Sequence, residues 1–318
     1  MKILVTGGAG FIGSNVVDAY LAAGHEVVII DNLFSGKWEN LNPNAKFYLL
    51  DIRSAEVAKV FAREKFDLIN HHAAQMSVPA SVEDPLFDAD VNVKGFVNLL
   101  EASRDTGVKK VIFISSGGAI YGEAEEFPTS EKSPPLPLSP YAITKSVSEQ
   151  YLAFYNHQYG LDYTILRYAN VYGPRQIPHG EAGVVAVFMD RLLAGKKCAV
   201  YHFPDEPRGM TRDYCFVGDI VQANLQAIDK GSKGAFNIGT CKETHTADLF
   251  NEVFAALKNL RPELDDDLRK YETGAGRPGD LTRSCLIYDK AGDELGFNPD
   301  FTLDRGLAET AKWRVALS

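Results

Sequence analysis

The chain has 318 residues, of which 45% are hydrophobic and 24% charged, as expected for one large globular domain or two closely packed ones. Its net charge of −9 argues against a general nucleic-acid or membrane-surface binder, because such proteins need a positive field. Its four cysteines have no metal-ligand or C-x-x-C spacing, and no apolar run approaches the ~18 residues of a membrane span. We therefore expect a cytoplasmic protein with reduced cysteines and no metal.

Short apolar runs alternate with segments of helical periodicity up to residue 170. The expected strands are Lys2–Thr6, Glu26–Asp31, Lys46–Asp51, Asp67–His71, Lys110–Ser116 and Tyr163–Asn170. The expected helices are Phe11–Ala23, Ser54–Lys65, Pro85–Asp105 and Tyr141–Gln158. The strands are β-branched or aromatic and do not alternate cleanly with polar residues, which indicates burial on both faces. The pattern predicts an α/β fold with a Rossmann-type, doubly wound parallel sheet.

After residue 170 the alternation weakens. Helices are expected near 183–194, 218–230, 246–258 and 304–315, with short strands near 197–201 and 235–238. Two loops, at 123–140 and 202–212, interrupt the pattern. The sequence therefore predicts a smaller carboxy-terminal α/β region packed against the sheet.

A glycine-rich segment follows the first expected strand and opens the first expected helix. Gly7 permits a tight turn, Gly10 lets the backbone approach a pyrophosphate, and Gly13 allows close packing of helix on strand. Asp31 ends the second strand, 18 residues after Gly13. A carboxylate there accepts hydrogen bonds from both ribose hydroxyls of NAD and repels the additional phosphate of NADP. The segment predicts an NAD site.

Further cofactor contacts are expected at the ends of neighbouring strands. The adenosine end of NAD is expected at Asn32, Ser35, Gly36, Asp51 and Ile52. The residues that the cofactor passes after the fourth strand are Ala73, Ala74 and Gln75. Asp51 would equally suit a helix N-cap, and the small residues after the fourth strand would equally suit close packing.

Tyr141 and Lys145 lie at i and i+4 at the start of a helix, on one helical face. A free phenol titrates near 10, but a nearby ammonium and the positive nicotinamide ring are expected to lower its pKa. Tyrosinate then takes a hydroxyl proton while hydride passes to NAD. Ser116, at the end of the fifth strand, is expected to hydrogen-bond the same substrate oxygen, although a strand-end cap also explains it.

At this point the sequence resembles the extended short-chain dehydrogenase/reductases of the NAD-dependent epimerase/dehydratase family, and within them the UDP-galactose 4-epimerase group. The resemblance covers nearly the whole chain and rests on Thr6–Gly13, Asp31–Asn32, His71–Ala74, Asn92, Ser115–Gly122, Tyr141 with Lys145, Arg167–Arg175, Arg212–Tyr214, Asn237–Gly239 and Arg277–Asp280.

The resemblance implies roles that spacing alone does not give. Tyr141 would be the acid/base, Lys145 would also hold the nicotinamide ribose, and Tyr168 would lie beside the nicotinamide. The further cofactor residues that it implies are Phe11, Ile12, His72, Asn92 and Ser115. The substrate residues that it implies are Asn170, Arg212 and Arg277 at the diphosphate, Asp280 at the uridine ribose, and Gly183, Val184, Tyr201 and Ser284. Without the resemblance, each arginine would equally suit a surface charge.

The chain departs from the family where many relatives have a catalytic Ser or Thr, because Gly117 stands there. We assign the hydroxyl role to Ser116, with Ser115 in reserve. Related dehydratases carry Asp-Glu just after the hydroxyl residue, and decarboxylases usually a Glu. Gly117, Gly118 and Ala119 cannot act as acids.

These residues favour a UDP-glucose/UDP-galactose 4-epimerase that works through a 4-keto sugar with tightly bound NAD. Because Ser284 stands where some epimerases have Tyr, UDP-GlcNAc and UDP-GalNAc are expected to fit as well. The alternatives are a UDP-glucuronate 4-epimerase, another dehydratase or decarboxylase of the family, an NAD-dependent alcohol dehydrogenase, and a non-catalytic NAD sensor.

The expected domain division and partner follow from the same resemblance. Residues 1–170 and about 213–240 would form the NAD-binding domain, and 171–212 with 241–318 the UDP-sugar-binding domain. A homodimer is expected through the helices at 85–105 and 141–158, because the second helix has apolar residues on more than one face.

Overall fold

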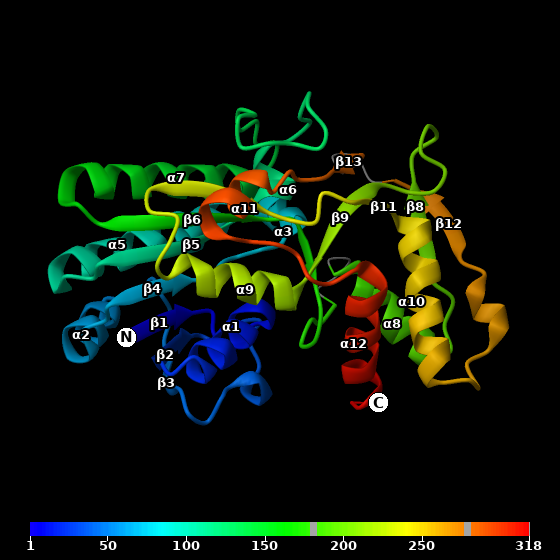
Figure 1. The fold of residues 1–318 in the computed structure, drawn as a ribbon, viewed down its shortest axis with the longest axis horizontal. Coiled ribbons are helices and arrows are strands. Elements are labelled where there is room, and N and C mark those ends of the chain that lie inside the picture. Colours follow the sequence, from blue (N-terminus) through cyan, green and yellow to red (C-terminus); the bar gives the residue numbers. More distant parts are fainter. Residues whose placement is uncertain (179–182, 277–280, 318) are drawn as a thin grey trace.

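The computed structural model describes residues 1–178, 183–276 and 281–317. Its larger part is a seven-stranded sheet in the order β10-β6-β5-β4-β1-β2-β3, and every neighbouring pair is parallel (Figure 1). Its strands are β1 (Lys2–Thr6), β2 (Glu26–Asp31), β3 (Lys46–Leu49), β4 (Leu68–His71), β5 (Lys110–Ser116), β6 (Asp162–Tyr168) and β10 (Gly234–Ile238). The predicted doubly wound parallel sheet is confirmed.

Both faces of this sheet are buried. Successive side chains of a strand point to opposite faces, so a continuous apolar run supplies residues to the core on each side. In β1, Ile3 and Val5 pack into the core of one face and Leu4 into that of the other. The helices of the first face are α1 (Phe11–Ala22), α9 (Val217–Ala227) and α11 (Asp289–Leu295). The helices of the second face are α2 (Glu56–Glu64), α5 (Gly95–Thr106) and α7 (Pro140–Tyr159).

The helix starts follow from local capping. The Ser139 side chain accepts a hydrogen bond from the Ala142 amide, and Pro140 occupies the first turn of α7. The helix expected over 85–105 is instead three consecutive elements, α4 (Pro85–Ala89), the π-helical segment η2 (Asp90–Lys94) and α5. Two short helices that the sequence pattern did not predict are α3 (Val78–Glu83) and α6 (Gly117–Ile120).

A smaller part of the molecule contains two further sheets beside the carboxyl ends of the large one (Figure 1). The first consists of β7 (Asn170–Tyr172), β9 (Thr211–Phe216), β11 (Glu243–His245) and β13 (Arg283–Ser284), and the second of β8 (Ala199–His202) and β12 (Glu272–Ala275). The helices of this part are α8 (Val184–Leu193), α10 (Thr246–Leu260) and α12 (Leu303–Val315). They form a separate apolar cluster with β8 and β9. Two 3₁₀ turns are η1 (Trp38–Asn40) and η3 (Asp266–Arg269).

Asp213 on β9 links the small sheet to the segment after β10. Its buried carboxylate accepts hydrogen bonds from the backbone amides of Thr240, Cys241 and Leu286 at 3.0, 3.2 and 3.3 Å. Satisfied in this way, a buried carboxylate needs no cation. The link holds β9 and the start of β11 against the end of β10, next to the cavity described below. None of the helices in the described segments is both long and apolar enough to cross a membrane.

Candidate active site

A cavity of about 1150 Å³ opens at the carboxyl ends of the large sheet, where ligands bind in open α/β folds. One wall comes from strand ends and the loops that follow them, including Asp31 at the end of β2, His72 after β4 and Ser116 at the end of β5. The opposite wall comes from the smaller part, with Val184 on α8, Tyr201 on β8 and Arg212 on β9. Pockets for one small ligand measure roughly 300–1000 Å³, so this cavity is larger than a typical single-ligand pocket.

The glycine turn has the geometry of a dinucleotide cradle. Gly7 has a φ of +71°, and a Cβ there would lie 2.7 Å from the Ala73 amide nitrogen. A Cβ on Gly13 would lie 2.3 Å from the carbonyl oxygen of Gly7. Among the described residues no side chain caps α1 at Gly10, so the amides of its first turn can bind a phosphate. The turn leaves no space for larger residues and fits NAD.

The carboxylate of Asp31 is buried at the end of β2, where it accepts hydrogen bonds from the amides of Ala9 at 3.0 Å and Leu33 at 2.8 Å. Burial raises the pKa of Asp31, and these two bonds oppose the rise. Asp51 binds Arg53 through two bonds and accepts from Asn32, so the Arg53 guanidinium holds the pKa of Asp51 at about 2. Asp51 accepts from the Arg53 amide and is not the N-cap of α2, which is Ala55.

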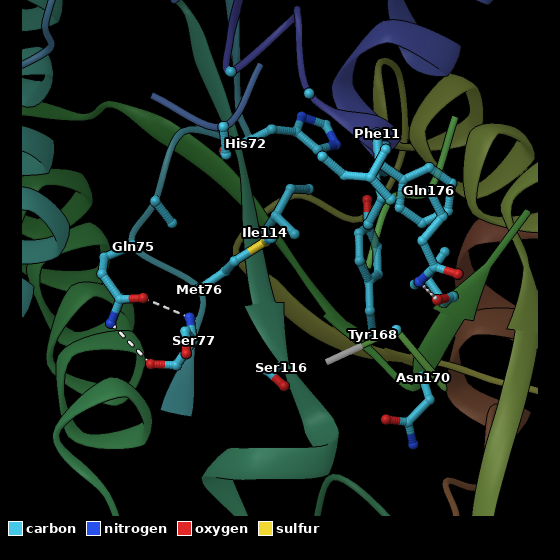
Figure 2. A pocket seen from close by; sticks show the side chains of 18 of the residues that line it. Phe11, His72, Gln75, Met76, Ser77, Ile114, Ser116, Tyr168, Asn170 and Gln176 are labelled. Atoms are coloured by element: carbon cyan, nitrogen blue, oxygen red, sulfur yellow. Dashed lines mark hydrogen bonds between the residues drawn. The ribbon is translucent and has the colours of Figure 1, made fainter. Parts of the chain in front are cut away.

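Tyr141 and Lys145 lie at the start of α7 in the wall of the cavity, as predicted. The Ser116 side chain lies near the phenol of Tyr141 and acts to lower its pKa. The Lys145 Nζ atom is buried, donates to the Ile114 carbonyl at 2.9 Å, and lies 5.9 Å from the centre of the Tyr141 ring. Figure 2 shows Ser116 at the end of its strand, facing the same space as Tyr168 and Asn170.

The expectation that Lys145 lowers the pKa of Tyr141 does not hold for the protein alone. Burial raises the pKa of Tyr141 to about 12, and the group that opposes the rise is Ser116. Burial also lowers the pKa of Lys145 to about 8, against the raising effects of Asp88 and Glu149. The ammonium is directed to the Ile114 carbonyl and not to the phenol oxygen. A tyrosinate therefore needs a positive charge beyond that of Lys145.

The structure separates the two candidate serines. Ser115 donates to the Glu149 carboxylate at 2.6 Å, and Arg167 donates to the same carboxylate through Nε at 3.1 Å and through its terminal nitrogen at 2.5 Å. Arg167 also donates to the Tyr121 hydroxyl at 2.8 Å. Ser115 thus belongs to a buried ion-pair network behind the site. The hydroxyl available to Tyr141 is that of Ser116.

Gly117 explains why the hydroxyl stands one residue early. A Cβ on Gly117 would lie 2.5 Å from the Leu286 side chain, which fills the space that a residue there would need. A Cβ on Gly118 would lie 3.5 Å from the Ser284 hydroxyl. Gly117 is therefore crowded by Leu286, whereas the Ser284 contact at Gly118 is an ordinary van der Waals distance.

Most predicted site residues that the structure describes lie in the cavity wall. The cofactor residues found there are Gly7, Gly10, Phe11, Ile12, Gly13, Asp31, Asn32, Ser35, Asp51, Ile52, His72, Ala73, Ala74, Gln75, Ser115, Tyr141, Lys145 and Tyr168. The substrate residues found there are Ser116, Asn170, Gly183, Val184, Tyr201 and Arg212. Three predicted residues that the structure describes lie outside the wall, namely Gly36, Asn92 and Ser284. Gly36 packs on Asp31, and Asn92 is in a buried polar network. Arg277 and Asp280 lie outside the described residues.

Three polar side chains in the wall, those of His72, Asn170 and Gln176, have atoms without a partner among the described residues. Both ring nitrogens of His72 and the amide nitrogen of Asn170 are buried and make no hydrogen bond there. Burial lowers the pKa of His72 to about 3, so its ring is neutral and offers one donor and one acceptor. Figure 2 shows His72 beside Phe11 and Asn170 directed into the open space. Such atoms are available to ligands.

Sequence reasoning missed several residues around the cavity. The wall also contains Phe34, Arg53, Met76, Phe87, Gln176, Arg191 and Glu272. Met210 is in the wall too, so at least one residue of the 202–212 loop reaches the site. Glu149 follows Lys145 by one helical turn, a spacing that indicates proximity to the site. No comparable signal identifies Asp88, because its sequence context does not distinguish it from the acids of a surface helix.

The chain matches the model of the NAD dependent epimerase/dehydratase family over residues 3–239. It belongs to this family. A UDP-glucose 4-epimerase from Mycolicibacterium smegmatis is 44% identical over 319 residues, which cover 98% of each chain. The structure of a UDP-glucose 4-epimerase from Thermotoga maritima with UDP-glucose is 46% identical over the whole of both chains, with a TM-score of 0.93. That of a Thermus thermophilus UDP-glucose 4-epimerase in complex with NAD is 42% identical, again over both whole chains, with a TM-score of 0.90.

Membership of this NAD-dependent family agrees with the cofactor predicted from the glycine turn and Asp31. The family's two reactions, epimerisation and dehydration, differ in the acids that they require. Ser116 lies in the cavity wall, and the residues that follow it in the chain are Gly117, Gly118 and Ala119. The local chemistry therefore matches the epimerase members more closely than the dehydratases.

Proposed function

We propose that the chain is a UDP-glucose 4-epimerase, which inverts the configuration at carbon 4 of a UDP-hexose through a 4-keto sugar. One observation carries the proposal: Tyr141, Lys145 and Ser116 together line one cavity of about 1150 Å³, and no acid stands at the three positions after Ser116. The UDP-glucose 4-epimerases that resemble this chain over its whole length support it. A reaction that needs only a proton relay and a redox cofactor fits these residues.

NAD would be held by the Gly7–Gly13 turn at its pyrophosphate, by Asp31 at its adenosine ribose, and by Lys145 and Tyr168 at its nicotinamide end. When bound, NAD supplies a reversible hydride acceptor and a positively charged ring that opposes the effect of burial on Tyr141. The His72 ring, unpartnered among the described residues, adds a donor in the same wall.

Tyr141 would take the proton of the sugar 4-hydroxyl and return it to the same oxygen after the sugar has turned over. Ser116 would hold the phenol and share that proton, since its hydroxyl both donates and accepts. Lys145 stays mostly protonated below its pKa of about 8 and keeps a positive charge beneath the reacting groups. Because Gly117, Gly118 and Ala119 supply no acid next to Ser116, water is not eliminated from the sugar.

The UDP moiety would bind along the wall formed by the smaller part. Asn170 offers an amide that is unpartnered among the described residues, Arg212 a guanidinium suited to a diphosphate, and Tyr201 an aromatic face. We include Arg277 and Asp280 on the strength of the family resemblance. The family resemblance puts Ser284 near the sugar, where a small side chain would leave space for an N-acetyl group; in the structure Ser284 is buried beside Gly118, outside the cavity wall. UDP-GlcNAc and UDP-GalNAc are therefore proposed as further substrates.

We also propose the homodimer and the division of labour between the domains. Leu86 on α4 and Ile143 and Phe154 on α7 are exposed apolar residues on the helices predicted to pair. Leu152 and Tyr155 on another side of α7 pack into the core, so the helix has two apolar faces. Residues 1–170 and 213–240 would bind NAD, and 171–212 with 241–318 the UDP-sugar. The free cysteines fit a cytoplasmic location.

The test is to incubate the purified protein, without added NAD, with UDP-galactose, UDP-GalNAc or UDP-glucuronate and to identify the products by NMR. UDP-galactose should give UDP-glucose, and Tyr141→Phe should lose about 10²–10⁴-fold in rate while NAD stays bound. Tyr151→Phe, the same substitution on the same helix, is the matched control. Steady NADH formation from added NAD would instead identify an alcohol dehydrogenase, and turnover of UDP-glucuronate alone would identify the uronate epimerase.

A further inference from the structure

A buried carboxylate lies directly behind the proposed catalytic helix, outside the cavity wall. Asp88 on α4 is fully buried. Its Oδ1 atom accepts hydrogen bonds from Gln75 Nε2 at 2.8 Å and Asn92 Nδ2 at 3.0 Å, and its Oδ2 atom accepts from Thr144 Oγ1 at 2.8 Å. These donors are neutral, so within the described part of the chain the residue is a buried charge held by neutral groups. Burying a carboxylate charge among neutral groups costs folding free energy, so a functional role is expected for it.

The three donors come from three different parts of the site. Gln75 follows β4 in the loop that lines the cofactor side of the cavity, and Asn92 lies in the π-helical segment η2. Thr144 is on α7, between Tyr141 and Lys145. Asn92 also exchanges two hydrogen bonds with the Gln75 backbone, at 2.9 and 3.0 Å. A single carboxylate thus joins the loop beneath the cofactor to the helix that carries the proton relay.

The position of η2 fits this arrangement. A π-helical turn rotates the residues that follow it relative to a regular helix, and such turns are frequent at functional sites. Here it brings Asn92 to within hydrogen-bond distance of Asp88 Oδ1 and of the Gln75 backbone. In addition, the Asn92 carbonyl accepts from Ser148 at 3.3 Å, one turn beyond Thr144 on α7. The irregular turn thus serves the same contact between the loop and α7.

The charge of Asp88 also acts on the two titrating groups of the site. Burial raises the pKa of Asp88, and the hydrogen bonds from Thr144 and Gln75 and the charge of Lys145 oppose the rise. Asp88 and Glu149 in turn both raise the pKa of Lys145, against the effect of burial. Burial and, to a smaller extent, Asp88 raise the pKa of Tyr141, and Ser116 opposes them. The other ionisable groups near Lys145 are His71 and His72, whose pKa values are lowered by burial, so both are neutral.

We propose that Asp88 is a positioning residue of the reaction: its carboxylate fixes α7 against the Gln75 loop, and its negative charge balances the buried Lys145 ammonium. The inference rests on the proposed roles of Tyr141 and Lys145. Without the carboxylate charge, Lys145 would lose its proton at lower pH, because one of the two groups that raise its pKa is gone. Tyrosinate would also form at lower pH, because a nearby negative charge no longer opposes it. Both limbs of the pH profile of kcat should therefore move to lower pH.

Asp88→Asn tests the charge with little change in shape. Its oxygen can still accept from Gln75 and Asn92, and its new amide can donate to Thr144 Oγ1. The Thr144 hydroxyl then donates to the Tyr141 carbonyl, which it already contacts at 3.0 Å. The measurement is kcat for UDP-galactose against pH, together with calorimetric titration of NAD into cofactor-free protein. The expected result is a whole profile displaced to lower pH, with NAD affinity within a few-fold of the wild-type value.

Thr144→Val is the matched variant, because it removes the bond between Asp88 and α7 and keeps the charge. It should lower kcat about 5- to 10-fold, the effect of one neutral hydrogen bond, with KM and the limbs of the pH profile unchanged. Wild-type kcat in Thr144→Val would overturn the positioning role. An unchanged pH profile in Asp88→Asn would overturn the electrostatic role. An Asp88→Asn protein that cannot fold would overturn it too, because the carboxylate would then be required for folding. If the proposed function itself is wrong, the wild-type protein will already show no epimerisation.

Discussion

Separate substitutions of the two adjacent serines at the end of β5 distinguish the proposed proton relay, which uses Ser116, from the ion-pair network behind it, which contains Ser115. Ser116→Ala removes the hydroxyl that acts to lower the pKa of the Tyr141 phenol against the effect of burial. A hydrogen bond to a charged group contributes about 1.5–3 kcal/mol, and about 1.4 kcal/mol is tenfold in rate. We therefore expect kcat to fall about 10- to 150-fold. Because the pKa of Tyr141 rises further, tyrosinate forms only at higher pH, and the acidic limb of the kcat profile should move to higher pH.

Ser115→Ala is the matched control on the neighbouring residue. It removes the 2.6 Å bond to Glu149, which Arg167 still holds through two nitrogens. It should therefore lower the free energy of unfolding by about 1–3 kcal/mol and leave kcat within a few-fold of the wild type. The assay is initial-rate conversion of UDP-galactose to UDP-glucose from pH 5 to 10, followed by NMR. A Ser115→Ala enzyme as slow as Ser116→Ala, or a fully active Ser116→Ala enzyme, would contradict the roles assigned to the two serines.

Three further predictions concern the support, the cofactor and the sugar. Glu149→Gln leaves Arg167 as a buried unpaired charge, so urea denaturation should show a loss of about 3–5 kcal/mol in unfolding free energy; a loss below about 1 kcal/mol would contradict this. Asp31→Ser should weaken NAD binding about 10- to 150-fold in calorimetric titration and reduce the preference for NAD over NADP. An unchanged ratio of the NAD and NADP affinities would argue against the contact with the ribose. Ser284→Tyr should abolish turnover of UDP-GalNAc and spare that of UDP-galactose, and intact UDP-GalNAc turnover would exclude the proposed N-acetyl space.

The large sheet was predictable because its strands are buried on both faces. In β1 and β2 the central residues are apolar whichever way they point, so the runs stand out from the helices between them. The strands β7, β9, β11 and β13 did not stand out, since they have two to six residues and include polar ones such as Arg212 and Asp213. Their pairing depends on long-range contacts, such as those of the Asp213 carboxylate, which a local pattern does not contain.

The candidate site was predictable where a residue type is unusual at its position, as at Gly7, Gly13 and Asp31. The side chains behind the site were less predictable. The spacing of Glu149 from Lys145 indicates proximity, but Asp88 is an ordinary acid in the sequence, and only the packing of α4 and α7 shows that it is buried near Lys145. The pKa of Tyr141 was misjudged for the same reason, because spacing on a helix does not reveal how strongly a phenol is buried.

The proposed epimerisation oxidises carbon 4 transiently and returns the same hydrogen to that carbon, so an isotope label can follow it. UDP-galactose carrying deuterium at carbon 4 is incubated with the purified protein in ordinary water, and the product is examined by NMR and mass spectrometry. We expect UDP-glucose that retains the deuterium at carbon 4. Loss of the deuterium to solvent would be incompatible with hydride return, because the inversion would then proceed by proton exchange at carbon 4.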